Sequence, residues 1–456
     1  MIRNGRSPLR RRAMAGPVVC RPRLPGGACA LLLAVLPGSP ALAYWQLTPQ
    51  AQVGITYENN PRYFSGAEKA NQLLLNPEAG DDALGVYLDA QLQGAFNTPS
   101  SQVSLTPRLR RTDYLRSNDD LNDADSYLNF SSAHRGSRGS VGLDARYQHA
   151  GVRSSEFESA TPTAPDAEPP LIAGSGQFTD TTQDTWNLEP SISFQLSPRN
   201  GISISGGFAE TTFDQRTVSN TVGRGQLDYQ NSTIDLTLRH FLNPKNSFIV
   251  ALNGGNFLSN QKDSNFENST DSFGITAAYE HSFSERLTGT ATVGVSRSSV
   301  EVSGIPNSPI IRNEERNFVG NVALRRRSEQ GYLNFTLGRQ VAPGSNGSEV
   351  VQDTLRLSLD RSLTRTLTGS LATIVQQQSA VGRIFQFNSP VAILARQDRT
   401  YITLDSTLTW RMTETLSLVG TYSYGFNKNA GIGSSDQETN NRLYVGALYR
   451  GVGFRR

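Results

Sequence analysis

Apolar and polar residues alternate with period two through almost the whole chain after residue 43, and this alternation constrains the fold more than any other feature. Leu84, Val86, Leu88 and Leu92 share one face of a segment whose other face is polar, and 181–197 repeats the pattern. Such alternation predicts β-strands with one dry and one wet face. No stretch after residue 43 is apolar for long enough to span a bilayer as a helix.

We delimit eighteen alternating segments, with sixteen as the alternative count. The seventh and ninth show the weakest alternation. The segments lie near 50–58, 83–96, 101–112, 126–134, 140–153, 181–197, 202–213, 226–242, 247–257, 271–283, 287–300, 315–327, 332–341, 350–363, 367–378, 399–412, 416–426 and 441–454. The last segment allows two phases, with either Leu443 and Val445 or Tyr444 and Phe454 facing outward.

The connections between these segments alternate in length. The turn after each even segment is short, as at 198–201 and 413–415, whereas most connections after odd segments are long and polar, as at 59–82 and 379–398. This rhythm is typical of membrane barrels, which have tight periplasmic turns and long external loops. A propeller or solenoid would need a motif repeating at a fixed period, and we find none. We therefore predict an all-β, antiparallel, up-and-down transmembrane β-barrel in a bacterial outer membrane.

The first 43 residues have a different composition. They hold seven arginines but no lysine or acidic residue, and they continue with an apolar run, 28–36, and with Ala41-Leu42-Ala43. A basic start, a short apolar run and a small-residue exit predict a signal peptide over residues 1–43, cleaved after Ala43. Residues 44–456 are then the barrel domain.

Removal of this segment changes what the composition implies. The full sequence has 43 Lys and Arg against 40 Asp and Glu, but its first 43 residues carry no carboxylate, so the remaining chain is acidic. The basic balance therefore does not indicate a nucleic-acid partner. Both cysteines, Cys20 and Cys29, also lie in the predicted signal, so the mature chain has no thiol for a disulfide, a metal or a nucleophile.

The polar faces of the strands should line the barrel interior. By phase they place basic and acidic residues in equal number on the inner wall, so we expect little charge selectivity from the wall itself. The tentative lumen-lining residues are Arg108, Arg110, Arg146, Arg239, Arg356, Asp89, Asp144, Glu189, Asp235 and Asp405, joined by Arg325, Arg411, Glu280 and Asp360. Few large apolar residues share this phase, which favours a wet wall over a packed core.

Aromatic residues stand near many strand ends and fit the interfacial girdles of a membrane barrel. The expected girdle residues are Trp45, Tyr57, Phe96, Tyr114, Tyr127, Trp186, Phe213, Phe283, Trp410 and Phe426. Ordinary strand composition is the alternative explanation, because aromatic residues favour strands in general.

Catalytic and metal-binding motifs are absent from the sequence. The four histidines, among them His149 near an outer strand end, are scattered, and no nucleophile elbow or nucleotide loop occurs. We expect no enzyme, no cofactor and no metal centre. Four carboxylates gather in one external loop, where a cation is the weaker alternative to a solvated loop. They are Asp119, Asp120, Asp123 and Asp125.

Several short segments carry a family resemblance. They are Thr48-Pro49-Gln50, Val53-Gly54-Ile55-Thr56-Tyr57-Glu58-Asn59-Asn60-Pro61, Leu105-Thr106-Pro107-Arg108-Leu109 and Asp144-Ala145-Arg146-Tyr147. In these the chain resembles β-barrel porin families found beside exopolysaccharide gene clusters, including those linked to PEP-CTERM/exosortase systems. The resemblance implies an outer-membrane barrel that aids polysaccharide export. Such barrels usually end on an aromatic residue, whereas here Phe454 is followed by two arginines.

Two functions follow from this reading. The first is a porin-like channel or export conduit for hydrophilic solutes, with exopolysaccharide as the cargo that the resemblance implies. The alternative is a structural or adhesive surface barrel without an open channel. The longest connection, 154–180, is expected either to enter the mouth or to form an outer cap. A plugged transporter of about 22 strands is disfavoured, because strands begin close to the predicted cleavage site. The expected partners are outer-membrane lipids and the barrel-assembly machinery.

Overall fold

The computed structural model describes ten stretches of the chain. They are residues 44–60, 82–115, 122–151, 182–214, 228–260, 267–303, 310–343, 349–380, 398–430 and 435–455. The chain divides into two compact units, Met1–Ala43 and Tyr44–Arg456, and the described residues all belong to the second. The predicted signal peptide, Asp119, Asp120 and the connection 154–180 lie outside the described residues.

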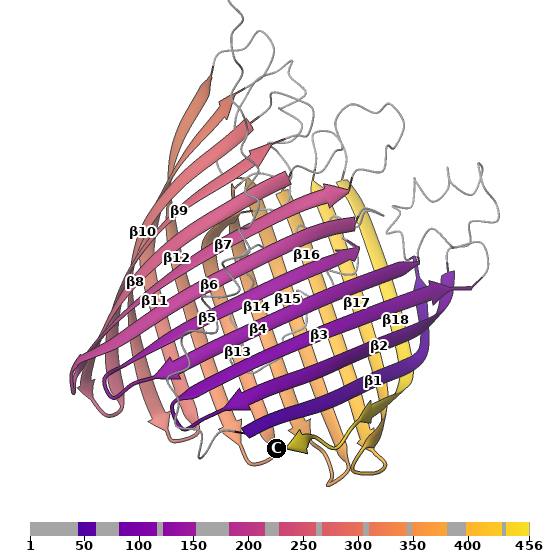
Figure 1. Cartoon of the computed structure of the whole chain (residues 1–456). Helices are drawn as coiled ribbons and strands as arrows, with labels where there is room; N and C mark the ends of the chain where they lie inside the picture. Colours follow the sequence, from indigo (N-terminus) through magenta and orange to yellow (C-terminus); the bar gives the residue numbers. More distant parts are fainter. Residues whose placement is uncertain are drawn as a thin grey trace, which may run out of the picture. The chain divides into compact units, whose positions relative to one another are not determined.

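All described secondary structure is β-strand, and the strands form one sheet that closes on itself (Figure 1). Each of the eighteen predicted segments overlaps one of the strands β1 to β18, which confirms the predicted fold class. The strands are β1 (Tyr44–Asn59), β2 (Asp82–Asn97), β3 (Ser101–Tyr114), β4 (Asp123–Arg135), β5 (Gly139–Gly151), β6 (Thr182–Ser197), β7 (Asn200–Asp214), β8 (Asp228–Asn243), β9 (Asn246–Asn260), β10 (Glu267–Ser284), β11 (Leu287–Ser303), β12 (Ile311–Ser328), β13 (Gly331–Pro343), β14 (Glu349–Ser362), β15 (Leu367–Ala380), β16 (Asp398–Arg411), β17 (Leu416–Ala430), β18 (Ser435–Arg450) and the two-residue β19 (Phe454–Arg455).

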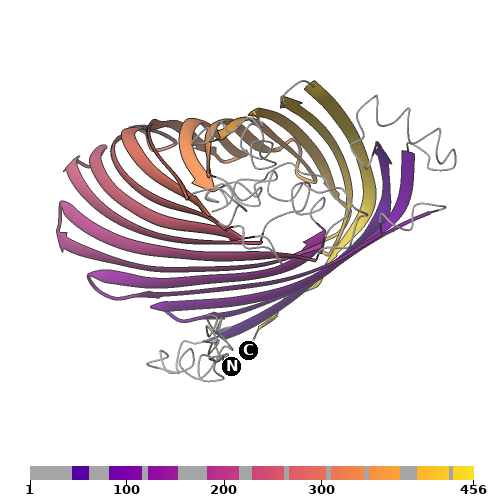
Figure 2. The ribbon, with the colours of Figure 1, turned by 90° about the horizontal axis from the view of Figure 1, so that it is seen from above.

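Each strand from β1 to β17 pairs antiparallel with the next strand in the sequence, and β1 closes the ring by pairing with β18 (Figure 2). We call this pairing, which runs from Gln50↔Arg450 to Asn59↔Asn441, the closure seam. Closure matters because an open sheet edge would leave unpaired backbone groups, each of which costs several kcal/mol in hydrocarbon.

The short turns all lie at one end of the barrel, which we call the turn end, and the opposite end is the loop end. Both Tyr44 and Phe454 lie at the turn end, as an even number of long strands requires. We assign the turn end to the periplasmic side, because tight turns in membrane barrels lie there.

The last strand takes the first of its two expected phases. Leu443, Val445 and Tyr449 are exposed on the outer face of β18, whereas Tyr444 is buried on the inner face. The strand breaks after Arg450, and β19 then pairs with Gln46 and Leu47 of β1. The break lets the terminal Phe454 be exposed as well, although the phase of β18 alone would place it on the inner face.

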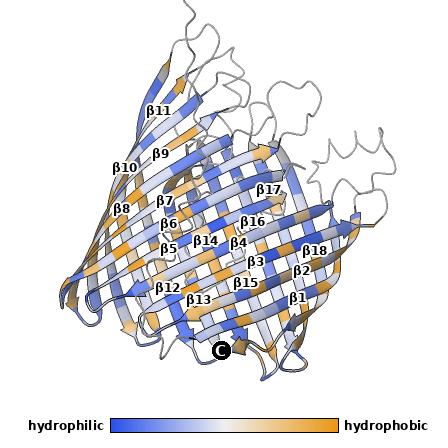
Figure 3. Ribbon diagram, viewed as in Figure 1, coloured by the Kyte–Doolittle hydropathy of each residue, from blue (hydrophilic) through white to orange (hydrophobic). Residues whose placement is uncertain are grey.

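The outer surface of the sheet is apolar, as the alternating colours along each strand show (Figure 3). Along β2, for example, Leu88 is 50% exposed whereas the next residue, Asp89, is 8% exposed. Exposed leucine, valine, isoleucine and phenylalanine side chains recur on the same face of nearly all the long strands. An apolar exterior on a closed sheet is the structure that satisfies backbone hydrogen bonds within lipid. The protein is therefore an outer-membrane β-barrel. No helix long and apolar enough to cross a bilayer occurs among the described residues.

The wall is least regular between β12 and β13. Their pairing begins at Gly320↔Arg339 and continues to Ser328↔Gly331, so residues 311–319 of β12 pair with β11 but not with β13. Residues 340–343 of β13 continue to pair with β14. The two strands therefore diverge toward the loop end, above Gly320.

Candidate functional site: the inner wall of the barrel

The sequence-predicted wall residues share the inner face of their strands, because each alternates with an apolar or aromatic neighbour on the outer face. The positions on this face are Asp89 on β2, Arg108 and Arg110 on β3, Asp144 and Arg146 on β5, Glu189 on β6, Asp235 and Arg239 on β8, Arg356 on β14 and Asp405 on β16. They do not form one cluster, and their surroundings differ around the ring.

The densest charged group lies on β2, β3 and β4. Arg108 contacts Asp89 through both Nε and Nη2, with the shortest distance at 2.6 Å, and Arg110 contacts Asp125 at 2.6 Å. The ring of Tyr127 lies below both guanidinium groups, at 5.2 Å from Arg108 Cζ and 5.5 Å from Arg110 Cζ. Arg108 and Arg110 are two residues apart on one strand, so the pleat points both to the same face. The carboxylates of the neighbouring strands fix them there.

A second charged group crosses the closure seam. Glu58 of β1 is 2% exposed, and its carboxylate lies 3.3 Å from Nε of Arg442 on β18. The hydroxyl of Tyr114 on β3 donates a hydrogen bond to the same carboxylate, and Arg442 Nε also donates to Thr56 Oγ1 at 3.2 Å. The sequence analysis missed this group. The sequence signal for this group is that Thr56 and Glu58 share one face of the first strand. Their partner, Arg442 on the last strand, can be identified only once the register of the closed ring is known.

An aromatic side chain packs over the same seam. The ring of Tyr444 meets that of Tyr87 edge-on at 5.1 Å. A Cβ at Gly54 would lie 2.7 Å from the Tyr444 hydroxyl, so the glycine allows the ring to lie flat against the wall. The seam is therefore held by side chains as well as by backbone pairing.

The remaining wall is mainly hydroxyl and amide groups with few ion pairs. Arg239 contacts Glu280 at 3.2 Å. Asp144 stands opposite Glu189, and Asp405 stands opposite Ser423, in their strand registers. Short hydroxyl ladders include Ser140–Ser193 at 2.7 Å and Thr407–Thr421 at 3.1 Å. This part of the wall offers hydroxyl and amide hydrogen bonds, with charged side chains spaced between them.

The proposed loop cation site is only partly described. Asp123 and Asp125 belong to β4 and lie on its inner face rather than in a loop. The carboxylate of Asp125 binds Arg110 and also accepts a hydrogen bond from the Gly151 amide at 3.0 Å. A carboxylate held in this way is an ion-pair partner in the wall. No group of potential metal ligands occurs in the stretches that the structure describes.

The expected girdle residues divide between the two faces of the sheet, and the expectation is wrong for those that face inward. Trp45, Trp186, Phe283 and Trp410 are exposed on the outer face. Three of the expected girdle residues instead face the interior and are buried: Tyr114, Tyr127 and Phe213. Aromatic residues favour strands on either face, so their position near a strand end does not reveal the face.

The interior also holds more apolar surface than the sequence phase predicted. Phe213, Tyr229 and Phe257 on β7, β8 and β9 form a buried cluster, with exposed fractions of 3%, 4% and 3%. Val300 and Val302 on β11 are buried on the same face. All five lie toward the loop end. The expectation of few large inward apolar residues is therefore wrong for β7, β8, β9 and β11 in the half of the barrel nearer the loop end, which we call the loop half.

His149, the histidine that stood out in the sequence, faces outward. Its Nδ1 lies 2.9 Å from Asp184 Oδ1, which also accepts a hydrogen bond from the Tyr147 hydroxyl at 2.8 Å. The ring of Tyr147 packs on Trp186 with centroids 4.5 Å apart. The histidine thus belongs to an aromatic and polar group near the outer rim of the lipid-facing surface.

Comparison with known proteins adds no family. No protein-family model matches the chain, and no curated protein matches it. Solved structures match in strand arrangement alone. The siderophore receptor PirA from Pseudomonas aeruginosa is 11% identical, with a TM-score of 0.42, over 90% of this chain and 80% of that one. The ferric-catecholate import receptor Fiu from E. coli K12 is 10% identical, with a TM-score of 0.42, over 88% and 81%. The FrpB iron transporter from Neisseria meningitidis is 8% identical, with a TM-score of 0.43, over 88% and 81%.

Proposed function

We propose that this outer-membrane barrel is a channel for hydrophilic solutes, with polysaccharide as its cargo. The observation that carries the proposal is the polar inner face of a closed ring of long strands, β1 to β18. Barrels of 16–18 strands are wide enough to leave an aqueous passage, whereas barrels of about eight strands are filled by side chains. Hydroxyl and amide groups on such a wall exchange hydrogen bonds with sugar hydroxyls as readily as with water. The choice of polysaccharide also draws on the family resemblance of the short segments.

A closed structural barrel is the second candidate, and one observation favours it. Inward side chains in the loop half are buried, including the cluster Phe213, Tyr229 and Phe257. Such burial shows that the inner wall near the loop end is not uniformly wet. A barrel closed to solvent at this level would serve as a surface anchor.

Conductance of the purified protein in planar bilayers separates the two candidates. We expect stepwise conductance that falls when a bulky group is attached to the inner wall. Thr237 faces inward and Leu238 faces outward on β8, so Thr237→Cys and Leu238→Cys form a matched pair. A bulky maleimide should lower the conductance of the first variant and leave that of the second unchanged. The mature chain has no other cysteine to react.

Correct folding of each variant is checked by resistance to unfolding in detergent at room temperature. A folded barrel that shows no conductance, and that admits no sugar in a liposome-swelling assay, would replace the channel by the closed surface barrel. Equal block of both cysteine variants would show that the current does not pass through the lumen.

A further inference from the structure

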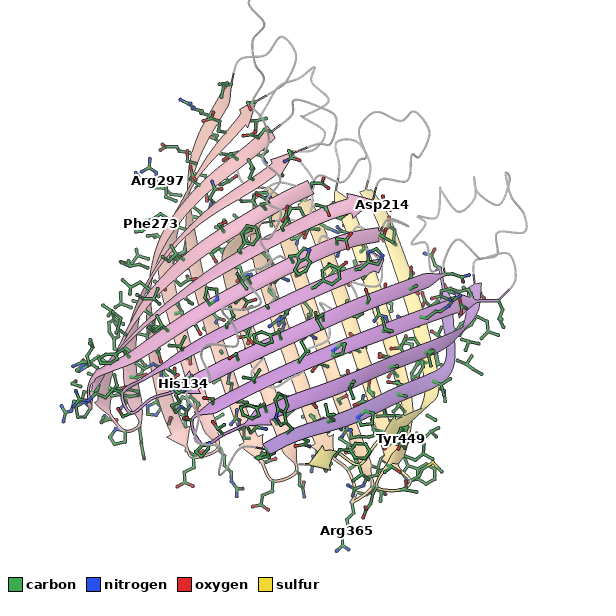
Figure 4. All side chains as sticks on the ribbon, in the orientation of Figure 1. His134, Asp214, Phe273, Arg297, Arg365 and Tyr449 are labelled. Carbon is green, nitrogen blue, oxygen red and sulfur yellow. The ribbon has the colours of Figure 1, made fainter. Side chains whose placement is uncertain are left out.

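The two ends of the barrel differ in charge. At the turn end, exposed cations far outnumber carboxylates among the described residues. The cations are Arg135, Arg138, Arg199, Lys245, Arg286, Arg326, Arg327, Arg361, Arg365, Arg411 and Arg450, and the carboxylates are Glu285, Glu329, Asp360 and Glu414. Figure 4 shows Arg365 extending from the turn end.

The cations at the turn end outnumber its carboxylates, so ion pairs among these described residues cannot balance all of them. Arg286 contacts Glu329 at 3.0 Å. Arg411 donates to the carbonyl oxygen of Arg365, and Arg361 donates to Gln330, so neither loses its charge to a carboxylate there. The turn end therefore carries a net positive charge that its own acidic residues do not cancel.

The loop half shows the opposite arrangement. Several of its arginines stand beside carboxylates, so the charge of those arginines is locally balanced. These pairs include Arg110–Asp125, Arg111–Asp113, Arg442–Glu58, Arg312–Glu301, Arg297–Glu314 and Arg339–Asp353. Further carboxylates, among them Asp214 (Figure 4), lie at the loop ends of the strands. The charge of the barrel is thus polarised along its axis.

A ring of cations around a mouth attracts anions through their summed field, and such a field raises association rates by about 10-fold to 1,000-fold. Guanidinium groups also bind carboxylates and phosphates through paired hydrogen bonds. The turns recur at every second strand, about 10 Å apart from the strand spacing. A small anion can contact one or two of these turns, whereas a polymer with repeated negative groups can contact several.

We propose that the turn end is a docking surface for an anionic polysaccharide that enters the barrel from that side. The polysaccharide component rests on the proposed function, and the negative charge rests on the cations at the turn end. Arg411 and Arg450 occupy inner-face positions at the mouth, and Arg199, Lys245 and Arg365 lie on the turns themselves. Cations that bound only the surrounding lipid headgroups would be confined to the outer face. The acidic loop end then lowers the affinity of the polymer as it leaves.

Binding of polygalacturonate, a linear polymer of carboxylated sugars, tests the docking surface on the purified full-length barrel. Dextran of the same length, which is uncharged, is the control polymer. We expect polygalacturonate to bind and dextran not to bind. Raising the salt from 0.1 M to 1 M should abolish most of the binding, because the Debye length falls from about 10 Å to about 3 Å.

Charge reversal locates the binding to one end. The double variant Arg199→Glu with Lys245→Glu should weaken polygalacturonate binding by about tenfold. Arg316→Glu with Lys428→Glu makes the same change in net charge toward the loop end, and it should leave binding unchanged. Arg199 and Lys245 lie on exposed turns, so their replacement leaves the strand pairing intact.

The outcomes separate this surface from the channel. Binding of polygalacturonate without conductance supports the docking surface and contradicts the channel. The docking-surface proposal fails if the barrel conducts without binding polygalacturonate preferentially, or if both double variants lose binding equally. The channel proposal is unaffected by either result. If the turn-end variant instead changes only binding to phosphatidylglycerol vesicles, the cations serve the lipid headgroups and the polysaccharide proposal fails.

Discussion

The loop half and the turn end of this barrel belong to the same strands but use charged residues in different ways. In the loop half, Glu58 and Asp125 are buried against Arg442 and Arg110 on neighbouring strands. At the turn end, cations such as Arg199 are exposed and outnumber the carboxylates near them. The first arrangement joins strands, and the second leaves a field that extends into the surrounding water.

The difference shows why a balanced wall and a polarised barrel are compatible. The period-two pattern of the sequence assigns each charged residue to one face of the sheet, and it places both signs on the inner wall. The structure adds the position of each charge along the barrel axis, and cations then outnumber carboxylates at the turn end. A region with equal numbers of both signs has little field at a distance, whereas a surplus of one sign acts over a Debye length of about 10 Å in 0.1 M salt.

Labelling of single cysteines on whole cells gives the largest contrast, because it is all or none. Asn260→Cys and Glu267→Cys at the loop end should react with a maleimide carried on a polymer too large to enter the barrel. Asn200→Cys and Lys245→Cys at the turn end should react only after the cells are opened. The expected topology places tight turns on the periplasmic side.

Reversed labelling would place the cations on the cell surface. The docking surface would then face the medium, and entry of a polymer from the periplasm would lose its electrostatic support. Labelling of all four variants on intact cells would instead indicate that the outer membrane is leaky. A periplasmic protein with an accessible thiol, in cells without the variants, is the control for such leakage.

Strand positions could be predicted from the sequence because the two faces of the sheet contact different environments, lipid outside and the barrel interior inside. Leu88 and Asp89 differ by one position and meet lipid and the interior, so a period-two pattern is enforced along the strand. The alternating lengths of turns and loops then supported an even number of strands in a closed ring. Several boundaries extend beyond the predicted ones, as in β1, which starts at Tyr44 rather than residue 50, whereas β5 and β8 are shorter at their loop ends than predicted. Backbone pairing continues past the lipid-facing band, where alternation is no longer required.

The contacts of the inner wall could be predicted only in part. Parity placed Asp89, Arg108 and Arg110 on one face, and neighbouring strands in the sequence made their pairing foreseeable. Glu58 and Arg442 are 384 positions apart and meet only because the ring closes with one particular register. The burial of Phe213 depends on the interior of the whole barrel, which periodicity does not describe.

Removal of a seam carboxylate should have the second largest effect. Glu58→Ala leaves Arg442 without its partner in a mostly buried position, and losing one member of a buried pair costs about 3 kcal/mol. We expect the free energy of unfolding in urea, measured in detergent micelles, to fall by about that amount. The double variant Glu58→Gln with Arg442→Met should recover part of the loss, since no unpaired charge remains.

The turn end supplies the matched control. Arg286 and Glu329 form a comparable ion pair at 3.0 Å, but their side chains are 64% and 85% exposed. Glu329→Ala should change the free energy of unfolding by no more than about 1 kcal/mol, because water screens an exposed pair. Equal effects at Glu58 and Glu329 would contradict the distinction between a joined loop half and an open turn end.

The smallest effect concerns the backbone of β12, where one strand spans both regions. Residues 321–326 pair with both β11 and β13, and residues 327–328 pair with β13, whereas residues 311–319 pair with β11 alone. The outward side chains at 312, 314 and 316 are charged, with Arg312 bound to Glu301 and Glu314 bound to Arg297, which places these positions above the hydrocarbon. Water can then reach the amides that point away from β11. In hydrogen exchange followed by mass spectrometry, roughly half of the amides of 311–319 should exchange early, while those of 321–328 stay protected. Uniform protection along β12 would show that β12 and β13 stay paired to the loop end in the membrane, and that the divergence above Gly320 does not persist there.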